Sequence, residues 1–158
     1  MLIMGIDPGL RFNGWGAVEF DRGAFRHIEN GTIKIPEKLP LPERLKLIHD
    51  GLFEVLSKYQ PAEVAIEETF VNMNPSSTLR LGQARGVAML TPALLGIPVF
   101  EYQPTLVKKS VVGVGHAAKG QIEMMVGILL GKPVIDSEHA ADALAIAITH
   151  AHNRNKIA

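Results

Sequence analysis

An apolar run that ends in a carboxylate constrains the fold of this chain more than any other feature. Residues Leu2–Ile6 are apolar apart from one glycine, which is typical of a strand buried on both faces of a sheet. Asp7 follows at once, before the turn residues Pro8 and Gly9. An unpaired carboxylate at the tip of a buried strand costs several kcal/mol or becomes protonated, so Asp7 needs a partner. The sequence therefore predicts a polar site where the first strand ends.

The hydrophobic pattern of the remaining chain predicts an α/β fold. Strands are expected at residues 1–7, 14–20, 25–35, 64–66 and 98–102. Helices are expected at residues 41–59, 75–95, 104–112 and 119–130, and from a cap at Asp136 or Ser137 to about residue 153. Three successive strands, followed by alternating strands and helices, predict a mixed sheet with helices on both faces. A length of 158 residues fits one domain over residues 1–158.

Composition excludes several classes of protein. The chain has no cysteine, so it has neither disulfides nor a thiolate metal site. No apolar run approaches the roughly 20 residues of a membrane helix and no signal peptide is evident, so we expect a cytoplasmic protein without membrane contact. The net charge of zero argues mildly against nucleic acid as a partner, but residues 71–158 carry 8 basic and 5 acidic side chains. A local basic patch matters more for phosphate binding than the total charge.

Acidic residues from distant segments are expected to meet at one edge of the sheet. Asp7 and Glu67 both end predicted central strands, and sites form at that edge of open α/β sheets. His139 and Asp142 are three positions apart on a helix that is otherwise alanine-rich and apolar, so they lie on the same side. Such a helix should be buried against the sheet, where a solvated Asp142 is hard to explain. Glu68 should face the opposite way from Glu67 and contact solvent.

These residue types favour a metal site. Carboxylate oxygens suit Mg²⁺ or Mn²⁺, and two such ions about 4 Å apart can activate a water and stabilise the leaving oxygen of a phosphodiester. Each residue alone has a simpler explanation, because Asp7 and Glu67 could be turn or cap residues and Asp142 could be capped or paired with a cation. His139 alone could be an ordinary residue of a helix N-terminus. Their order on this pattern of elements favours the metal site.

Five motifs carry a resemblance to a known family. They are Gly5-Ile6-Asp7-Pro8-Gly9, Ala65-Ile66-Glu67, Leu81-Gly82-Gln83-Ala84-Arg85-Gly86, Val107-Lys108 with Val111-Val112-Gly113, and Ala140-Ala141-Asp142-Ala143-Leu144-Ala145-Ile146-Ala147. With these motifs in this order, the chain resembles RuvC-type Holliday-junction resolvases of the ribonuclease H-like superfamily over nearly its whole length. The resemblance implies a mixed five-stranded sheet, a homodimer and Mg²⁺-dependent hydrolysis that leaves 5′-phosphates. It also implies that the substrate is a four-way DNA junction cut by paired nicks in recombination and repair, with branch-migration proteins as partners.

The resemblance also assigns site residues. The acidic residues of the family fall on Asp7, Glu67 and Asp142, whereas the fourth, often Asp, is His139 here, as in some members. An imidazole is a softer ligand than a carboxylate and suits Mn²⁺ better than Mg²⁺. Because His139 breaks the all-acidic pattern, the chain could alternatively be a protein that binds junctions without cutting them. Another nuclease of the same fold is a further alternative, whereas an actin-like phosphotransferase needs two lobes and a longer chain.

The DNA-contacting residues that the resemblance implies are Lys108, Lys119 and Phe70. Both lysines are expected to hold the scissile phosphate, and Phe70 is expected to stack on unpaired bases at the junction centre. They could instead be solvated lysines and a phenylalanine packed under its own loop. Because residues 71–74 lack the expected basic side chains, Arg80 and Arg85 become candidates for contacts with the DNA backbone, or else residues of a dimer interface or helix surface. His150 and His152 are expected to cap the last helix or face water.

Overall fold

The computed structural model describes residues 1–68, 74–113, 118 and 120–157. Its strands are β1 (Leu2–Asp7), β2 (Phe12–Asp21), β3 (Ala24–Lys34), β4 (Glu63–Glu67) and β5 (Val99–Tyr102). Its helices are α1 (Leu41–Tyr59), α2 (Pro75–Leu94), α3 (Pro104–Val112), α4 (Gln121–Leu129) and α5 (Glu138–Ile157). The predicted order of elements is confirmed, with boundaries that differ by a few residues.

The five strands form one mixed sheet in the order β3-β2-β1-β4-β5. β1, β2 and β3 pair as an antiparallel meander, whereas β4 and β5 run parallel to β1. Ile6 pairs with Ile66, so β1 and β4 end side by side at the same edge of the sheet. This register makes Asp7 and Glu67, the last residues of those strands, neighbours.

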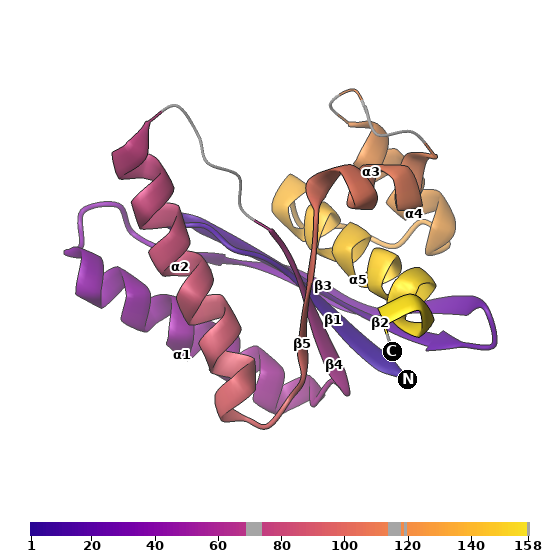
Figure 1. Cartoon of the computed structure of the whole chain (residues 1–158), viewed down its shortest axis with the longest axis horizontal. Coiled ribbons are helices and arrows are strands. Elements are labelled where there is room, and N and C mark those ends of the chain that lie inside the picture. The colour runs from indigo at the N-terminus through magenta and orange to yellow at the C-terminus, as the bar shows by residue number, and fades with distance from the viewer. Residues whose placement is uncertain (69–73, 114–117, 119, 158) are drawn as a thin grey trace.

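Helices cover both faces of the sheet, as Figure 1 shows. α1 and α2 lie on one face, over a core that includes Met4, Ile6 and Leu52. α5 lies on the other face with α3 and α4 packed beside it, over a core that includes Ile3, Val126 and Leu144. Because both faces are covered, the central strands have no solvent-facing side and their apolar runs are explained.

α5 lies unusually close to the sheet, because glycines remove the side chains that would keep it away. A Cβ built at Gly5 would lie 1.8 Å from the Ala143 carbonyl oxygen, and one at Gly14 would lie 2.0 Å from the His139 carbonyl oxygen. The helix contributes alanine at 140, 141, 143, 145 and 147, all of them buried. Small residues on both partners therefore bring the backbone of α5 into direct contact with β1 and β2.

The start of α5 is fixed by hydrogen bonds to β3. Ser137 is the cap, since its Oγ accepts a hydrogen bond of 3.1 Å from the Ala140 amide and also bonds to the Thr32 hydroxyl. Asn30, which is 8% exposed, donates to the Val134 carbonyl at 2.9 Å and accepts from the Asp136 amide at 2.8 Å. These bonds set where the helix begins and hence where its second residue, His139, lies.

The expectation that His150 caps a helix or faces water is wrong. α5 continues to Ile157, and His150 is fully buried between the sheet and the helix. Its Nε2 bonds to the Glu63 carboxylate and its Nδ1 lies 2.6 Å from the Tyr102 hydroxyl. Burial lowers the pKa of His150, against the opposing effect of the Glu63 carboxylate. Polar partners on β4 and β5 stabilise this buried histidine, and sequence periodicity cannot reveal them. His152 is exposed, as expected.

The close contact of α5 predicts that a methyl group at Gly5 is costly. In Gly5→Ala the new Cβ meets helix backbone, which cannot rotate away, so the free energy of unfolding should fall by about 3 kcal/mol or more. Gly127→Ala in α4 is the control, because a Cβ there meets nothing within 4 Å. Urea unfolding measures both variants. Equal stability of Gly5→Ala and the wild type would contradict the packing described.

Candidate active site

Three carboxylates and one imidazole meet at the edge of the sheet where β1 and β4 end. The Nδ1 atom of His139 lies 3.4 Å from Oδ2 of Asp7. Burial and the negative charges of Asp7 and Asp142 raise the pKa of Glu67 to about 7. Burial and the charge of Asp7 likewise raise the pKa of Asp142 to about 7. Glu67 and Asp142 also line one cavity, so the four predicted residues lie at the same edge of the sheet.

The oxygen and nitrogen atoms of these four side chains suit a divalent cation, although the side chains do not surround a single point. Within residues 1–68, 74–113, 118 and 120–157, no three histidine or acidic side chains are gathered closely enough to coordinate one ion as they stand. Mutual repulsion opposes a closer approach of the carboxylates, and a cation between them would offset it. Hard carboxylate oxygens with one imidazole suit Mg²⁺ or Mn²⁺.

His139 is held by a stack of side chains. Its ring stacks on the Phe12 ring, with 5.2 Å between the ring centres and an angle of 17° between the planes. The Arg11 guanidinium also lies over the Phe12 ring, 5.4 Å from its centre. The hydrogen bond to Asp7 raises the pKa of His139 despite its partial burial. Stacking fixes the plane of the imidazole, and the Asp7 contact fixes which nitrogen faces the carboxylate.

Sequence reasoning missed the residues that shape the turn after Asp7. Asn13 is fully buried, accepts a hydrogen bond of 3.0 Å from the Gly9 amide and donates one of 2.8 Å to the Gly9 carbonyl. Arg44 of α1 donates to the Leu10 carbonyl at 2.8 Å. An asparagine within an otherwise apolar and glycine-rich strand is a signal that could have identified Asn13, because a buried amide needs fixed partners.

Lys108 of α3 is a basic residue that lies beside the acidic residues. It lines a cavity of about 130 Å³ together with Glu67, Asp142, Pro104, Val107 and Ile122. Its charge lowers the pKa of Glu67, against the larger opposing effects of burial and Asp7. A neighbouring cavity of about 370 Å³ is also lined by Lys108 and Asp142, with Glu123 and Glu138 at its wall. A phosphate that entered these cavities would therefore meet an ammonium group beside the carboxylates.

The remaining DNA-binding candidates fall into two groups. Phe70 and Lys119 lie outside the described residues. Arg80 is exposed on α2, whereas Arg85 of the same helix is 16% exposed in its side chain and bonds to protein groups. The DNA-backbone role of Arg85 stays a prediction, and its internal contacts point elsewhere. Glu68 is exposed, as expected, with its amide bonded to the Tyr102 carbonyl at 2.7 Å.

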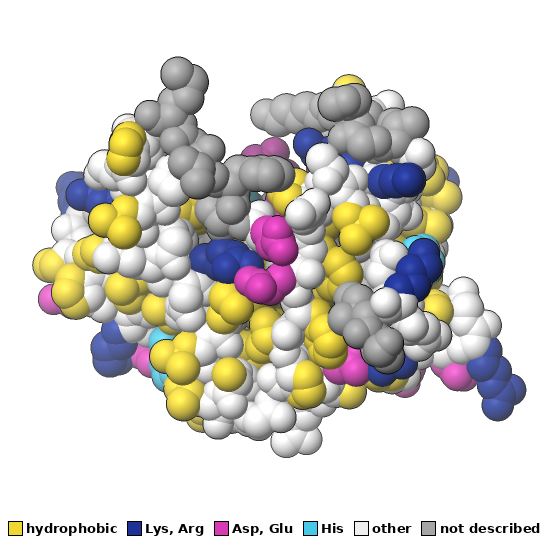
Figure 2. All heavy atoms as spheres, viewed as in Figure 1, with side chains coloured by type: hydrophobic (Ala, Val, Ile, Leu, Met, Phe, Trp, Pro, Cys, Tyr) yellow, Lys and Arg dark blue, Asp and Glu magenta, His cyan; other side chains and the backbone are white. Residues whose placement is uncertain are grey.

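The surface beside this edge combines both signs of charge. Figure 2 shows acidic side chains next to a basic one near the middle of the face, beneath a hollow between the α2 side and the α3–α4 side of the molecule.

Comparison with known proteins identifies the family. A family model described as crossover junction endodeoxyribonuclease RuvC matches residues 3–150. A relative of that name from Azorhizobium caulinodans is 58% identical over 156 residues, covering 99% of this chain and 92% of the relative. The chain belongs to the RuvC family. Another RuvC, from Xanthobacter autotrophicus, is 54% identical with the same coverage.

A solved RuvC structure confirms the fold. The structure described as T. thermophilus RuvC in complex with Holliday junction substrate is 36% identical, with a TM-score of 0.90, and the match covers 99% of this chain and 96% of that one. The predicted ribonuclease H-like α/β class, a mixed five-stranded sheet with helices on both faces, is therefore confirmed. None of the described helices is long and apolar enough to cross a membrane.

The raised pKa values of Glu67 and Asp142 predict how stability depends on pH without metal. Each folded-state pKa of about 7 lies above the ordinary values of 4.5 and 3.8, so the folded chain binds more protons than the unfolded chain between about pH 4 and 7. The free energy of unfolding should therefore fall as pH rises through this window. Glu67→Gln should be more stable than the wild type at pH 8 by on the order of 2 kcal/mol, with no difference near pH 4.

Urea unfolding in EDTA at several pH values measures this difference. Exposed Glu54 of α1 supplies the control variant, Glu54→Gln, which should follow the wild type at every pH. Saturating Mn²⁺ should stabilise the wild type more than Glu67→Gln, because the ion binds the folded carboxylates. A Glu67→Gln protein that is less stable than the wild type at pH 8 in EDTA would rule out the repulsion described.

Proposed function

We propose that this chain is a metal-dependent endodeoxyribonuclease that resolves four-way DNA junctions by paired symmetric nicks. One observation carries the proposal: Asp7, Glu67, His139 and Asp142 converge at one edge of the sheet in a member of the RuvC family. The similar T. thermophilus protein is described with a Holliday junction as its substrate. A single domain over residues 1–158 and a cytoplasmic location stay predictions from the sequence, and branch-migration partners stay a prediction from the resemblance.

The carboxylates of Asp7, Glu67 and Asp142 would hold the metal, with His139 as a further ligand or as a partner of the attacking water. Mg²⁺ is the proposed ion and Mn²⁺ its substitute, and the bound ion would supply the positive charge that activates water and stabilises the leaving 3′-oxygen. The Nδ1 contact with Asp7 leaves Nε2 of His139 for the water or the ion. Hydrolysis would leave a 5′-phosphate and a 3′-hydroxyl.

Basic and aromatic residues would bind the DNA. Lys108 lines the cavity with Glu67 and Asp142, which supports a role in holding the scissile phosphate. Lys119 is proposed for the same role and Phe70 for stacking on unpaired bases, both from the family resemblance. Exposed Arg80 is proposed to contact the DNA backbone.

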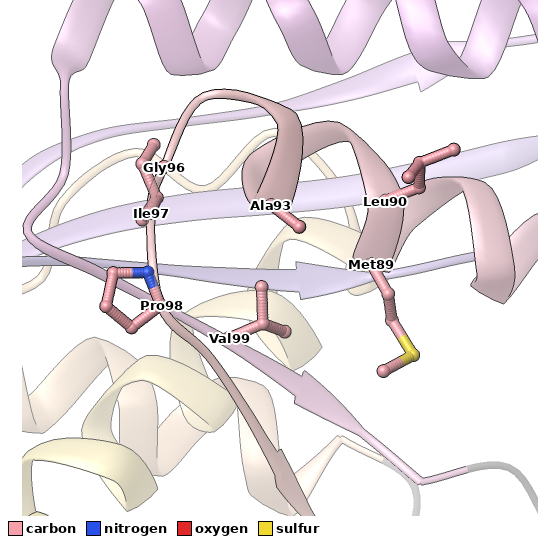
Figure 3. A pocket seen from close by; sticks show the side chains of 7 residues that line it. All are labelled: Met89, Leu90, Ala93, Gly96, Ile97, Pro98 and Val99. Carbon is pink, nitrogen blue, oxygen red and sulfur yellow. The ribbon is translucent and has the colours of Figure 1, made fainter.

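The outer face of α2 supports the homodimer. Leu79, Leu90 and Leu94 are 65%, 53% and 65% exposed, and Gly82 and Gly86 between them present no side chain. A groove of about 530 Å³ continues this face from Leu90 toward β5 (Figure 3). An exposed apolar stripe of this kind is typical of a protein interface, and a second copy with the same stripe would cover it by two-fold symmetry. A two-fold dimer would match the symmetry of a four-way junction.

Asp7→Asn tests the catalytic assignment. The variant should bind a synthetic four-way junction with unchanged affinity, because the amide keeps the shape of the carboxylate, but it should cut the junction at least about 100-fold more slowly. Nicking of a labelled mobile junction in Mg²⁺ and in Mn²⁺ measures the rate, and binding in EDTA measures the affinity. Asp21→Asn is the control, since Asp21 is exposed at the end of β2.

The outcomes separate the alternatives. Normal cutting by Asp7→Asn would overturn the assignment of the site. A wild type that binds junctions but never nicks them with either ion would favour a non-catalytic junction-binding protein. Equal cutting of plain duplex DNA would favour another nuclease of the same fold.

Leu90→Glu tests the dimer. A buried, unpaired carboxylate at the interface should shift the protein to monomers at micromolar concentration, because it costs several kcal/mol in each subunit. Analytical ultracentrifugation measures the mass, and Ile128→Glu is the control, because Ile128 is 54% exposed on α4 across the sheet from α2. A wild type that is monomeric, or a Leu90→Glu protein that stays dimeric, would contradict the proposed interface.

A further inference from the structure

Arg85 occupies an unusual place for an arginine that contacts DNA. It lies on α2, and its side chain is only 16% exposed. Its Nε donates to the backbone carbonyl of Glu67 at 3.2 Å, its Nη1 lies 3.3 Å from the Met89 sulfur, and its Nη2 pairs with the Glu101 carboxylate. All three guanidinium nitrogens therefore have partners within the protein, and a side chain that is mostly buried offers a phosphate little access to the remaining N–H groups.

The carbonyl that Arg85 binds belongs to a residue of the acidic site. Glu67 is the last residue of β4, and the strand pairing of β1 with β4 ends one residue earlier, at Ile6 and Ile66. Beyond that point the chain is tied to β5, where Glu67 pairs with Tyr102. The guanidinium of Arg85 supplies a further tie at the place where the pairing with β1 has ended.

The other partner of Arg85 completes a bridge across the sheet edge. Glu101 belongs to β5, beside β4, and its carboxylate balances the charge of Arg85. A guanidinium is planar and rigid, so its acceptors fix both its position and its orientation. Arg85 thus connects α2, the end of β4 and β5 through one inflexible group.

We propose that Arg85 is a positioning residue for Glu67 and not a DNA contact. By holding the Glu67 carbonyl, Arg85 fixes the backbone from which the Glu67 carboxylate projects toward Asp7 and Asp142. The role rests on the proposed metal site, because its consequence is the affinity of that site for a divalent cation. Outer partners that orient a metal ligand commonly change metal affinity or activity by about 10- to 100-fold when removed.

Metal binding and junction binding separate positioning from DNA contact. Arg85→Met should weaken Mn²⁺ binding by about tenfold or more in calorimetry of the free protein, while junction affinity in EDTA stays within about twofold of the wild type. Arg85→Lys should behave like Arg85→Met, since a single ammonium group cannot replace the several fixed donors of a guanidinium. An arginine that only contacted a DNA phosphate would be replaced by lysine with a smaller loss. Glu67→Gln with Arg85→Met should bind Mn²⁺ no more weakly than Glu67→Gln alone, because both changes act on one ligand.

Two further variants guard against a general loss of structure. Glu101→Gln leaves Arg85 in place but removes its ion-pair partner, so it should weaken Mn²⁺ binding less than Arg85→Met does. If circular dichroism shows that Arg85→Met is unfolded, the result for Glu101→Gln decides the question. Arg26→Met is the matched control, because it removes the exposed Arg26–Glu19 pair beside Leu2, at the other end of β1 from Asp7. It should change neither measurement.

Weaker junction binding with unchanged Mn²⁺ binding in the Arg85 variants would overturn the positioning role and restore Arg85 as a DNA contact. Unchanged values in both measurements would overturn it as well. A wild type whose Mn²⁺ binding is absent, or is not weakened by Glu67→Gln, would instead overturn the proposed metal site, and the role of Arg85 with it.

Discussion

The direct contact between α5 and the sheet is the constraint on which the site depends. Gly5 and Gly14 leave no room for a side chain beneath the helix, and the alanines of α5 leave none above the sheet. Only this close approach brings His139 and Asp142 of the helix to the ends of β1 and β4. This close packing costs little side-chain entropy, because glycine and alanine have almost none to lose on burial. Packing of the smallest residues thus places the residues of the candidate site.

That packing works against electrostatics at the edge of the sheet. Burial raises the pKa of Glu67 and Asp142, and the charge of Asp7 adds to the effect. The folded chain therefore holds the carboxylates close enough for their charges to repel one another, in surroundings that solvate them less than water does. The bonds of Asn30 and Ser137 fix the start of α5, so the helix cannot slide to relieve the repulsion. A divalent cation or protons can relieve it instead, which makes a cation the natural counterpart of this arrangement.

Much of this arrangement could be predicted from the sequence, because strand ends and helix faces follow from periodicity. The ends of β1 and β4 locate Asp7 and Glu67, and the spacing of three between His139 and Asp142 places them on one side of α5. Partners across the fold could not be predicted in this way. His150 is buried because Glu63 and Tyr102 lie opposite it, and Asn13 is buried because it closes the turn at Gly9. The partners of His150 depend on register between distant segments, and the Asn13 bonds depend on the conformation of a local turn, neither of which periodicity contains.

α2 shows why position on a helix matters more than residue type. Arg80 and Arg85 are the same residue on the same helix, yet Arg80 is exposed and Arg85 is bonded inside the protein. The buried side of α2, with Ala84 and Ala88, packs toward the sheet, and the opposite side carries exposed Leu90. A rigid helix that touches Glu67 through one side and a second subunit through the other would set the position of each active site relative to the two-fold axis. In the proposed dimer, the distance between the two sites would then depend on α2.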